Sequence, residues 1–200
     1  MYQPLARVSV LLLILLFSLG AHAAPDEPKD FIVALTRDLE TALMEARQQG
    51  LLEDQQHLDG LIDEHILPHV DRETLSKQVY RPRWDEIVAQ GKAEQAANAV
   101  IASLKRTYRL ALAAYNGQQI EVSDSIDKGR YQLVRTRVHT RENGHTIDLA
   151  LRQVEGEWRI FDLSVDGVVV TKTLSGSIQR LLEEDDIDTI IRAIDPKSKP

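Results

Sequence analysis

The stretch that decides the fold is Ile120–Val165, IEVSDSIDKGRYQLVRTRVHTRENGHTIDLALRQVEGEWRIFDLSV. Apolar residues alternate with polar ones along it, as at Leu149 and Leu151, and this period of two is typical of half-buried β-strands. Asn143-Gly144 is a strong signal for a tight hairpin turn between two such runs. The stretch therefore predicts four consecutive strands in an antiparallel meander. They are centred on Ile120–Val122, Tyr131–Val138, Ile147–Leu151 and Trp158–Val165.

The chain on either side of this stretch has the period of an α-helix. Apolar residues recur at three- and four-residue spacing, and Gly50 and Pro68 mark helix ends. Asp71 is placed to cap one helix, and Asp185 or Asp186 to cap another. The predicted helices before the strands are Phe31–Gln49, Glu53–Leu67, Asp71–Val79, Trp84–Ala89 and Lys92–Tyr115, and those after them lie at Leu174–Leu182 and Ile187–Ile194.

The order of helices, a strand meander and closing helices predicts an α+β fold, in which N-terminal and C-terminal helices flank a curved antiparallel four-stranded sheet. A parallel nucleotide-binding sheet needs strands that alternate with helices, and this alternation is missing. The chain also has neither a G-x-G-x-x-G motif nor a phosphate-binding G-x-x-x-x-G-K-S/T motif. A nucleotide-binding enzyme is therefore not expected.

Residues 1–23 are predicted to be a secretory signal peptide. A twelve-residue apolar run, Val8–Leu19, follows one basic residue, and Ala21-His22-Ala23 has the small-x-small pattern that signal peptidase recognises. A membrane-spanning helix needs about 20 apolar residues, so this run is too short. We expect cleavage before Ala24 and export to the periplasm. The mature chain is expected to have a flexible leader over 24–30, a single domain over 31–195 and a polar tail over 196–200.

Composition narrows the classes of function. The whole chain has a net charge of −7, which becomes −8 when the predicted signal peptide is removed together with Arg7. An acidic chain is a poor candidate for binding nucleic acid or anionic membrane surfaces. The chain has no cysteine, which excludes lipoprotein anchoring and disulfides. Aromatic residues make up only 5% of it, which argues against a sugar-binding module.

No set of residues predicts catalysis or metal binding. His65 and His69 are four residues apart, but Pro68 breaks the helix between them and the H-E-x-x-H order is absent. We expect His69 to cap or hydrogen-bond at a turn instead. Ser175 lacks the G-x-S-x-G context of a nucleophile. The sequence therefore predicts no enzyme, no catalytic residue, no metal site and no cofactor.

The apolar residues of the long helix and of the strands fit two arrangements. They interlock as a dry core, or they leave a lumen for an apolar ligand. Periodicity does not separate the two arrangements, because it fixes the face of each element and not the distance between elements. Composition alone favours the core, since every domain needs one.

Three motifs together resemble a known family. Ile66–Asp71 (ILPHVD), followed by Trp84, resembles its Leu-Pro-aromatic-Val-Asp turn and the Trp beyond it. Leu104–Leu112 (LKRTYRLAL) is similar to its Arg-Thr-Tyr helix, and Trp158–Val168 (WRIFDLSVDGV) is similar to its Trp-x-Val/Ile-aromatic-Asp strand. The family is that of the MlaC-type, or toluene-tolerance, periplasmic phospholipid-binding proteins. The resemblance covers about Phe31–Ile194.

The resemblance implies that helices and sheet enclose an apolar cavity, with acyl chains inside and the headgroup near its mouth. It implies a carrier that moves phospholipid across the periplasm and maintains the lipid asymmetry of the outer membrane. The implied partners are phospholipid, the lipid-binding subunit of an inner-membrane ABC transporter and an outer-membrane lipoprotein–porin complex. Val79–Arg83 and Lys172–Leu174 depart from the family pattern, so ligand and docking contacts stay open.

The predicted cavity wall comes from the long helix and the strands. Arginines are candidates for the headgroup, because guanidinium groups suit phosphate geometry. Trp84 and Trp158 are expected to be structural anchors and not ligand contacts. The predicted wall residues are Leu104, Tyr108, Leu112, Val134, Val138, Leu149, Leu151, Phe161 and Leu163, and the headgroup candidates are Arg81, Arg83 and Arg106.

Three other functions stay open at this point. A small periplasmic enzyme on a similar scaffold would need polar groups that converge in a pocket. An interaction or scaffold protein would have a solid core, and a diverged relative would carry another amphiphile. Organic extraction and mass spectrometry of the purified mature protein distinguish these alternatives.

Overall fold

The structure is a computed structural model and describes residues 27–140 and 144–195. The predicted signal peptide, the first residues of the leader, the hairpin residues 141–143 and the polar tail lie outside the described residues. The helices are α1 (Pro28–Gln48), α2 (Gln55–Leu61), η1 (Ile62–Ile66), η2 (Leu67–His69), α3 (Arg72–Val79), η3 (Arg81–Arg83), α4 (Trp84–Ala89), α5 (Ala93–Ala113), α6 (Val170–Ser177), α7 (Gln179–Glu184) and α8 (Ile187–Ile194). The strands are β1 (Gln119–Asp127), β2 (Gln132–His139), β3 (Gly144–Val154), β4 (Glu157–Val165) and β5 (Val168–Val169).

The strands form one antiparallel sheet in the order β1-β2-β3-β4-β5, which confirms the predicted meander. Its register places Val134 of β2 opposite Leu149 of β3, and Leu149 opposite Leu163 of β4. The prediction of four strands is corrected by β5, which pairs with the end of β4. The turn before β5 has positive φ angles at Asp166 (50°) and Gly167 (83°), which reverse the chain over two residues.

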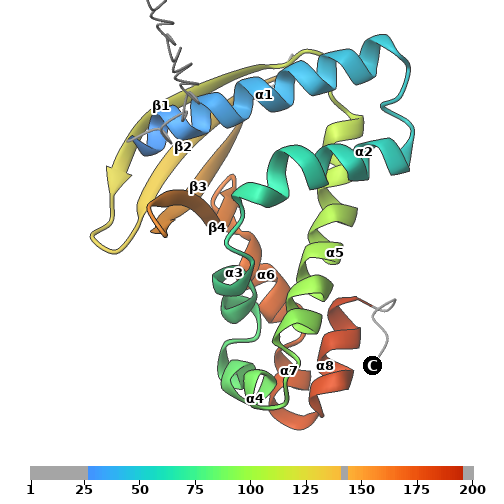
Figure 1. The fold of residues 1–200 in the computed structure, drawn as a ribbon, viewed down its shortest axis with the longest axis vertical. Helices are drawn as coiled ribbons and strands as arrows, with labels where there is room; N and C mark the ends of the chain where they lie inside the picture. Colours follow the sequence, from blue (N-terminus) through green and yellow to red (C-terminus); the bar gives the residue numbers. More distant parts are fainter. Residues whose placement is uncertain (1–26, 141–143, 196–200) are drawn as a thin grey trace, which may run out of the picture.

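Helix α1 covers part of the sheet, and the other helices lie beside the sheet and beyond one end of it, as Figure 1 shows. α1 lies across the sheet near β1 and β2, α2 lies beside α1, and α5 runs from α2 down to a base formed by α3, α4, α6, α7 and α8. α3 and α6 contact both each other and β4, and so join the base to the sheet. This arrangement confirms the predicted α+β fold. None of the helices in the described part of the chain has the length and hydrophobicity of a membrane span.

The predicted helix caps are confirmed. Asp71 accepts a hydrogen bond from the Thr74 backbone N–H at 3.0 Å and so caps α3. Asp186 accepts one from the Thr189 N–H at 3.0 Å and so caps α8. Helix α1 begins at Pro28, earlier than the predicted start, because proline lacks the N–H that the first turn leaves unpaired.

Two predicted helices are divided in the structure. The segment predicted as one helix over Glu53–Leu67 ends as α-helix at Leu61, widens into the π-turn η1 and tightens into the 3-10 turn η2. Pro68 explains this change, because it donates no hydrogen bond and disfavours α-helical geometry at the preceding residue. The segment predicted around Leu174–Leu182 is likewise divided at Ile178 into α6 and α7.

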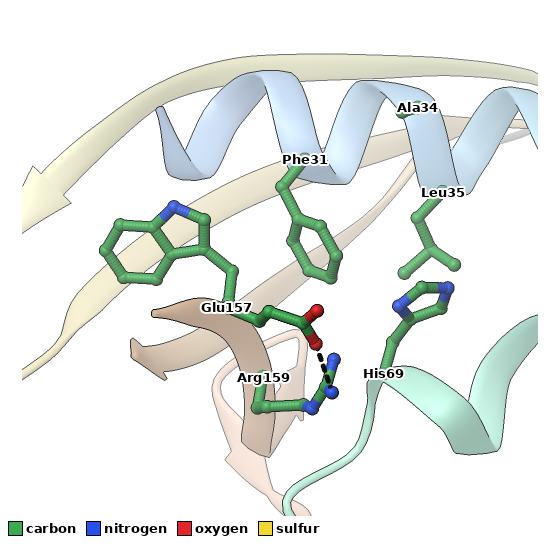
Figure 2. Close-up of a pocket in the computed structure, with 7 residues that line it drawn as sticks. Phe31, Ala34, Leu35, His69, Glu157 and Arg159 are labelled. Carbon is green, nitrogen blue, oxygen red and sulfur yellow. Dashed lines mark hydrogen bonds and ion pairs between the residues drawn. The ribbon is translucent and has the colours of Figure 1, made fainter. Parts of the chain in front are cut away.

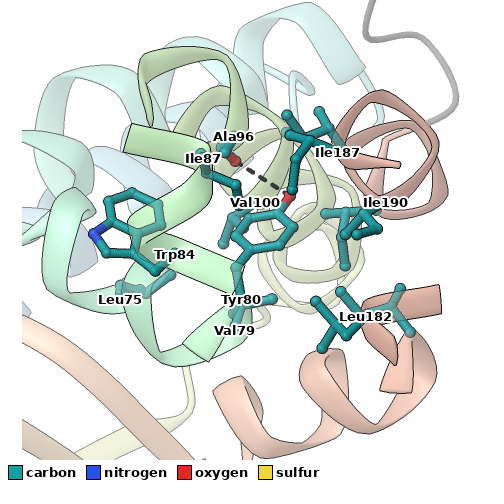
Figure 3. Packing of buried hydrophobic residues seen from close by; sticks show 14 residues of the cluster. Leu75, Val79, Tyr80, Trp84, Ile87, Ala96, Val100, Leu182, Ile187 and Ile190 are labelled. Atoms are coloured by element: carbon teal, nitrogen blue, oxygen red, sulfur yellow. Dashed lines mark hydrogen bonds between the residues drawn. The ribbon is translucent and has the colours of Figure 1, made fainter. Parts of the chain in front are cut away.

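The apolar interior consists of separate clusters. The helical cluster fills the base around Tyr80, which is 0% exposed (Figure 3). The Tyr80 hydroxyl donates to the Ala96 carbonyl oxygen at 3.4 Å, and burial raises the pKa of this phenol. Trp84 is buried here, as a structural anchor should be. The cluster comprises Leu75, Val79, Tyr80, Trp84, Ile87, Ala96, Ala99, Val100, Ile178, Leu182, Ile187, Ile190, Ile191 and Ile194.

Two smaller clusters involve α1. The sheet cluster joins the start of α1 to the sheet and comprises Phe31, Ile32, Val134, Leu151 and Ile160. The α1–α2 cluster comprises Leu43, Ala46, Leu58 and Leu61. The molecule therefore has a densely packed base and a thinner apolar layer between α1 and the sheet.

Candidate functional site

A pocket of about 270 Å³ lies between α1, η2 and the first residues of β4. Its size is just below the usual range of ligand pockets, which is roughly 300–1,000 Å³. Figure 2 shows His69 facing Leu35, with Glu157 and Arg159 on the β4 side of Phe31. The lining residues are Phe31, Ala34, Leu35, His69, Glu157, Trp158 and Arg159.

Three elements that are distant in sequence bring these residues together. Helix α1 places Phe31 and Leu35 one turn apart on the face that covers the sheet. The segment after η2 is tied to β4 by a parallel bridge between Val70 and Ile160 and by the Asp71 N–H, which donates to the Ile160 carbonyl oxygen at 2.8 Å. His69 is therefore held next to the start of β4.

His69 contributes an unusual polar atom to the pocket. Its Nδ1 is buried and has no hydrogen-bond partner among the described residues. The expectation that His69 caps or hydrogen-bonds at a turn is therefore wrong for this nitrogen. The ring instead packs edge-on against Phe31, with centroids 5.4 Å apart and planes at 71°. Burial lowers the pKa of His69, and the positive charge of Arg159 lowers it further.

Arg159 and Glu157 form an ion pair beside His69, with an Arg159 terminal nitrogen donating to the Glu157 carboxylate. The Arg159 side chain is 28% exposed and the Glu157 side chain is 55% exposed. The pocket therefore combines an apolar wall from α1 with a neutral imidazole and a guanidinium. This combination suits an amphiphile, and it offers no nucleophile paired with a base.

Most of the predicted wall residues on the strands share one face of the sheet. Directly paired residues project from the same face, so Val134, Leu149 and Leu163 form a row across three strands. Leu151 follows Leu149 by two residues and is buried in the sheet cluster. Val138 follows Val134 at an even spacing and is half-buried.

The remaining predicted wall residues lie elsewhere. Phe161 is the extra residue of a bulge in β4, and its ring packs edge-on against Tyr131 at 5.6 Å. On α5, Leu104 packs against the helical cluster and Leu112 packs against the α1–α2 cluster. Tyr108 is half-buried on the same helix, and burial raises the pKa of its phenol. The pocket lining contains none of the nine, and their role as cavity wall stays a prediction.

The predicted headgroup arginines are positioned away from this pocket. Arg83 donates to Glu86 at 2.6 Å and to two carbonyl oxygens at the end of α7. Arg106 donates to the Asp195 carboxylate at 2.7 Å and thereby joins α5 to the end of α8. Arg81 is exposed. Headgroup binding by these three residues stays a prediction, and Arg159 is the arginine that lines the pocket.

The histidines do not form a metal site with neighbouring acids in the part of the chain that the structure describes. His65 lies on η1, and its Nδ1 is 2.6 Å from a carboxylate oxygen of Asp38 on α1. No group of three or more His, Asp or Glu side chains within residues 27–140 and 144–195 is arranged to hold a metal ion.

A comparison with protein-family models identifies the chain. The model described as MlaC protein matches residues 37–195, which is most of the sequence. The chain belongs to the MlaC family. MlaC proteins are non-enzymatic lipid carriers of the periplasm, so the predicted family and the prediction of no enzymatic activity are confirmed. The predicted signal peptide itself lies outside the described residues.

A comparison with solved structures finds a protein of similar fold. One solved structure with a similar fold is a phospholipid-binding protein from Ralstonia solanacearum in complex with a phospholipid. The two share 16% sequence identity, and the match has a TM-score of 0.74 and covers 86% of this chain and 97% of the other. No curated protein sequence matches this chain significantly.

Sequence reasoning missed the pocket residues of this MlaC protein for identifiable reasons. Phe31 and Leu35 belong to the apolar stripe of the first predicted helix. The sequence shows this stripe but does not show which other element it packs against. Trp158 was expected to be only an anchor, whereas it packs against the sheet cluster and also lines the pocket. Arg159 is the next residue of a strand with alternating polar and apolar residues, so it was not distinguished from other polar strand residues. The sequence offers one local sign of this site: His69 is a polar residue in the turn just before Asp71, the N-cap of α3.

Proposed function

We propose that this protein carries phospholipid through the periplasm and thereby helps to maintain the lipid asymmetry of the outer membrane. The observation that carries the proposal is the match to the MlaC family over residues 37–195. The Ralstonia protein of similar fold, in complex with a phospholipid, supports the same ligand class.

The physical requirement for such a carrier is to shield acyl chains from water. Exposure of an acyl chain costs about 0.8 kcal/mol per CH₂ group, so a lipid leaves a bilayer unaided only rarely. The carrier removes this barrier by offering apolar surface, and the half-buried Val138, Leu149 and Leu163 provide such surface on the sheet face next to α1. The pocket of about 270 Å³ is smaller than a phospholipid, so two acyl chains would need further space along this face.

The proposed partners are the lipid-binding subunit of an inner-membrane ABC transporter and an outer-membrane lipoprotein–porin complex. A carrier without catalytic groups moves lipid only down a gradient of affinity between the partners that it meets. The net charge of −7 disfavours direct adsorption to anionic membrane surfaces, which supports exchange through proteins.

Organic extraction of protein purified from its native periplasm tests the proposal. We expect mass spectrometry to find phospholipid in the extract in near-stoichiometric amount. A clean extract would contradict the proposal and favour a scaffold protein, whereas a different amphiphile would identify another cargo.

A matched pair of variants links the lipid to the sheet face. Leu149→Asp introduces a charge on the half-buried face and is expected to abolish lipid retention, because burial of an unpaired carboxylate is costly. Leu110→Asp makes the same change at a side chain that is 74% exposed and should retain lipid. Circular dichroism verifies that both variants are folded.

A further inference from the structure

Helix α2 and the π-turn η1 form one segment, Gln55–Ile66, which we call the strap. It lies beside α1 and crosses the C-terminal half of α5 (Figure 1). On the α1 side the strap is anchored by apolar packing, because its Leu58 and Leu61 are buried in the α1–α2 cluster. On the same side, the His65 Nδ1 is 2.6 Å from a carboxylate oxygen of Asp38. The strap is therefore attached to α1 by both apolar and polar contacts.

The contacts between the strap and α5 change in kind along α5. At the C-terminal end of this helix, Leu112 packs against the α1–α2 cluster. Closer to its middle, Arg109 donates to both carboxylate oxygens of Asp59, each at 2.8 Å. One turn further from the end, the Lys105 Nζ donates to the two carboxylate oxygens of Asp63 at 2.7 and 2.8 Å. The attachment to α5 thus changes from apolar packing to ion pairs towards η1.

These ion pairs hold the strap less strongly than the apolar contacts do. The Asp63 side chain is 55% exposed and the Asp59 side chain is 31% exposed. Water replaces the lysine or arginine at such a carboxylate when the pair separates, so partly exposed ion pairs contribute little. Separation of buried apolar side chains exposes them to water and costs more. The strap is therefore held most weakly at Asp63 and most strongly near Leu112.

The backbone of the strap changes its geometry between the two ion pairs. The α-helix ends at Leu61, the π-turn covers Ile62–Ile66, and the 3-10 turn Leu67–His69 follows. Such changes of helix type within a helical segment frequently occur at hinges and functional sites. The part of the strap with Asp63 can therefore bend away from the part with Asp59.

Apolar surface lies behind the outer ion pair. Leu104 and Tyr108 are four residues apart on α5 and form a half-buried stripe next to Lys105. Burial raises the pKa of the Tyr108 phenol, and the negative charge of Asp162 on β4 raises it further, so this ring lies close to β4. Leu163, the next residue of β4, is half-buried. An opening between η1 and α5 would therefore lead to apolar side chains of α5 and of the sheet.

We propose that the strap is the gate through which the cargo enters and leaves, and that it opens by separating from α5 while it stays attached to α1. The Asp63–Lys105 pair breaks first, the Asp59–Arg109 pair breaks second, and the apolar contacts around Leu112 act as the hinge. Acyl chains then pass between η1 and α5 onto the apolar surface behind them. The proposal rests on the lipid-carrier function proposed above and adds the route of its cargo.

A removable cross-link tests the gate, and the absence of cysteine from the chain allows it to be placed at chosen positions. Asp63→Cys together with Lys105→Cys replaces the outer ion pair. A short bis-methanethiosulfonate reagent joins the two thiols through disulfides, which a reductant cleaves. Delipidated protein is mixed with phosphatidylglycerol vesicles that contain a self-quenching fluorescent phospholipid, and the increase in fluorescence gives the rate of uptake.

The matched control is an ion pair of the same chemistry in the base. The Lys92 Nζ and a carboxylate oxygen of Asp188 are also 2.7 Å apart, and this pair joins the start of α5 to α8. Lys92→Cys together with Asp188→Cys receives the same reagent. Because the base does not open in the proposed movement, this cross-link should leave the rate of uptake unchanged.

The cross-linked strap is expected to slow uptake about 10-fold or more, as a lid that limits the rate would when it is held closed. Reduction should restore the rate. Equal rates before and after reduction would overturn the proposal, and so would an equal slowing by the control cross-link. If the wild type itself takes up no lipid, the carrier function fails, whereas uptake by the wild type that the strap cross-link does not slow overturns only the gate.

A second variant tests the outer ion pair without a cross-link. Asp63→Asn keeps the shape of the side chain and removes its charge, so the gate should open more readily. We expect the rates of uptake and release to increase about 1.5- to 5-fold, which corresponds to the loss of one partly exposed ion pair. Asp188→Asn is the matched control and should retain the wild-type rates. Unchanged rates in Asp63→Asn would contradict the proposed order of opening.

Discussion

The helical cluster and the sheet face contain the same types of apolar residue but pack them differently. In the base, Val79, Val100 and Ile190 are 0% exposed (Figure 3). On the sheet, Val138 and Leu163 are only half-buried, although strand pairing places both on the face that α1 partly covers. The base resembles the close-packed interior of an ordinary domain. The sheet also contains fully buried side chains, Val134 and Leu151, but Val138 and Leu163 keep part of their apolar surface exposed.

The difference indicates that stability and the pocket depend on different regions of the molecule. The base contains the largest cluster of buried apolar side chains and therefore contributes the largest share of the free energy of apolar burial. The layer between α1 and the sheet contains the pocket and the unpaired Nδ1 of His69, features that reduce stability in the absence of a ligand. The following substitutions test whether the two regions are as different as the structure indicates.

The largest effect is expected in the base. Ile190→Ala should lower the free energy of unfolding by about 2–5 kcal/mol, because it leaves a cavity that the surrounding helices cannot fill. Urea denaturation measures this loss, and the folded fraction should retain its lipid. A loss below about 1 kcal/mol would show that the base is not rigidly packed.

The second-largest loss of stability is expected at the junction between the base and the sheet. Asp71 caps α3 and also pairs with Arg152 of β3, so Asp71→Ala should cost about 1–2 kcal/mol of unfolding free energy. Asp71→Asn retains the cap and loses only the charge, and its smaller loss measures the ion pair. Asp186→Ala removes a cap within the base and is the matched control. An Asp71→Ala loss no greater than that of Asp71→Asn would exclude a role for the cap.

A smaller effect on stability is expected on the sheet. Leu163→Ala removes a half-buried side chain and creates no closed cavity, so we expect a loss of about 1 kcal/mol or less. The amount of lipid extracted from this variant should nevertheless decrease. Equal stability losses in Leu163→Ala and Ile190→Ala would mean that the sheet is packed as tightly as the base and would break the comparison.

The smallest effect is expected from the protonation of His69. Its pKa is lowered in the folded state, so the unfolded state binds more protons below the ordinary pKa of 6.5. Its contribution to stability is therefore complete above that value and is lost as the pH falls towards its folded pKa. His69→Phe should make the fall in unfolding free energy between about pH 7.5 and pH 5 less steep, as measured by urea denaturation. An identical pH dependence in both proteins would show that His69 is not buried as a neutral group.

Much of the fold could be predicted because its signals are local. The alternation of Leu149 and Leu151 with polar residues indicates a strand, and Asp71 indicates a helix N-cap. Neither signal depends on tertiary contacts. Pro68 marks a helix end from its own chemistry, although the π-turn that precedes it required the structure. The fifth strand was missed because two residues are too few to show a period.

The candidate site depended on contacts that the sequence does not encode locally. Nothing near His69 reveals that Arg159 lies beside it, because the bridge from Val70 to Ile160 is a tertiary contact. The sequence by itself determined the order of the main elements and their apolar faces, since both follow from residue type and spacing, and its motifs carried the resemblance to the family. Only the tertiary structure decided which apolar faces close into a core and which leave a pocket, because that depends on the distance between elements and on the partner that each side chain finds.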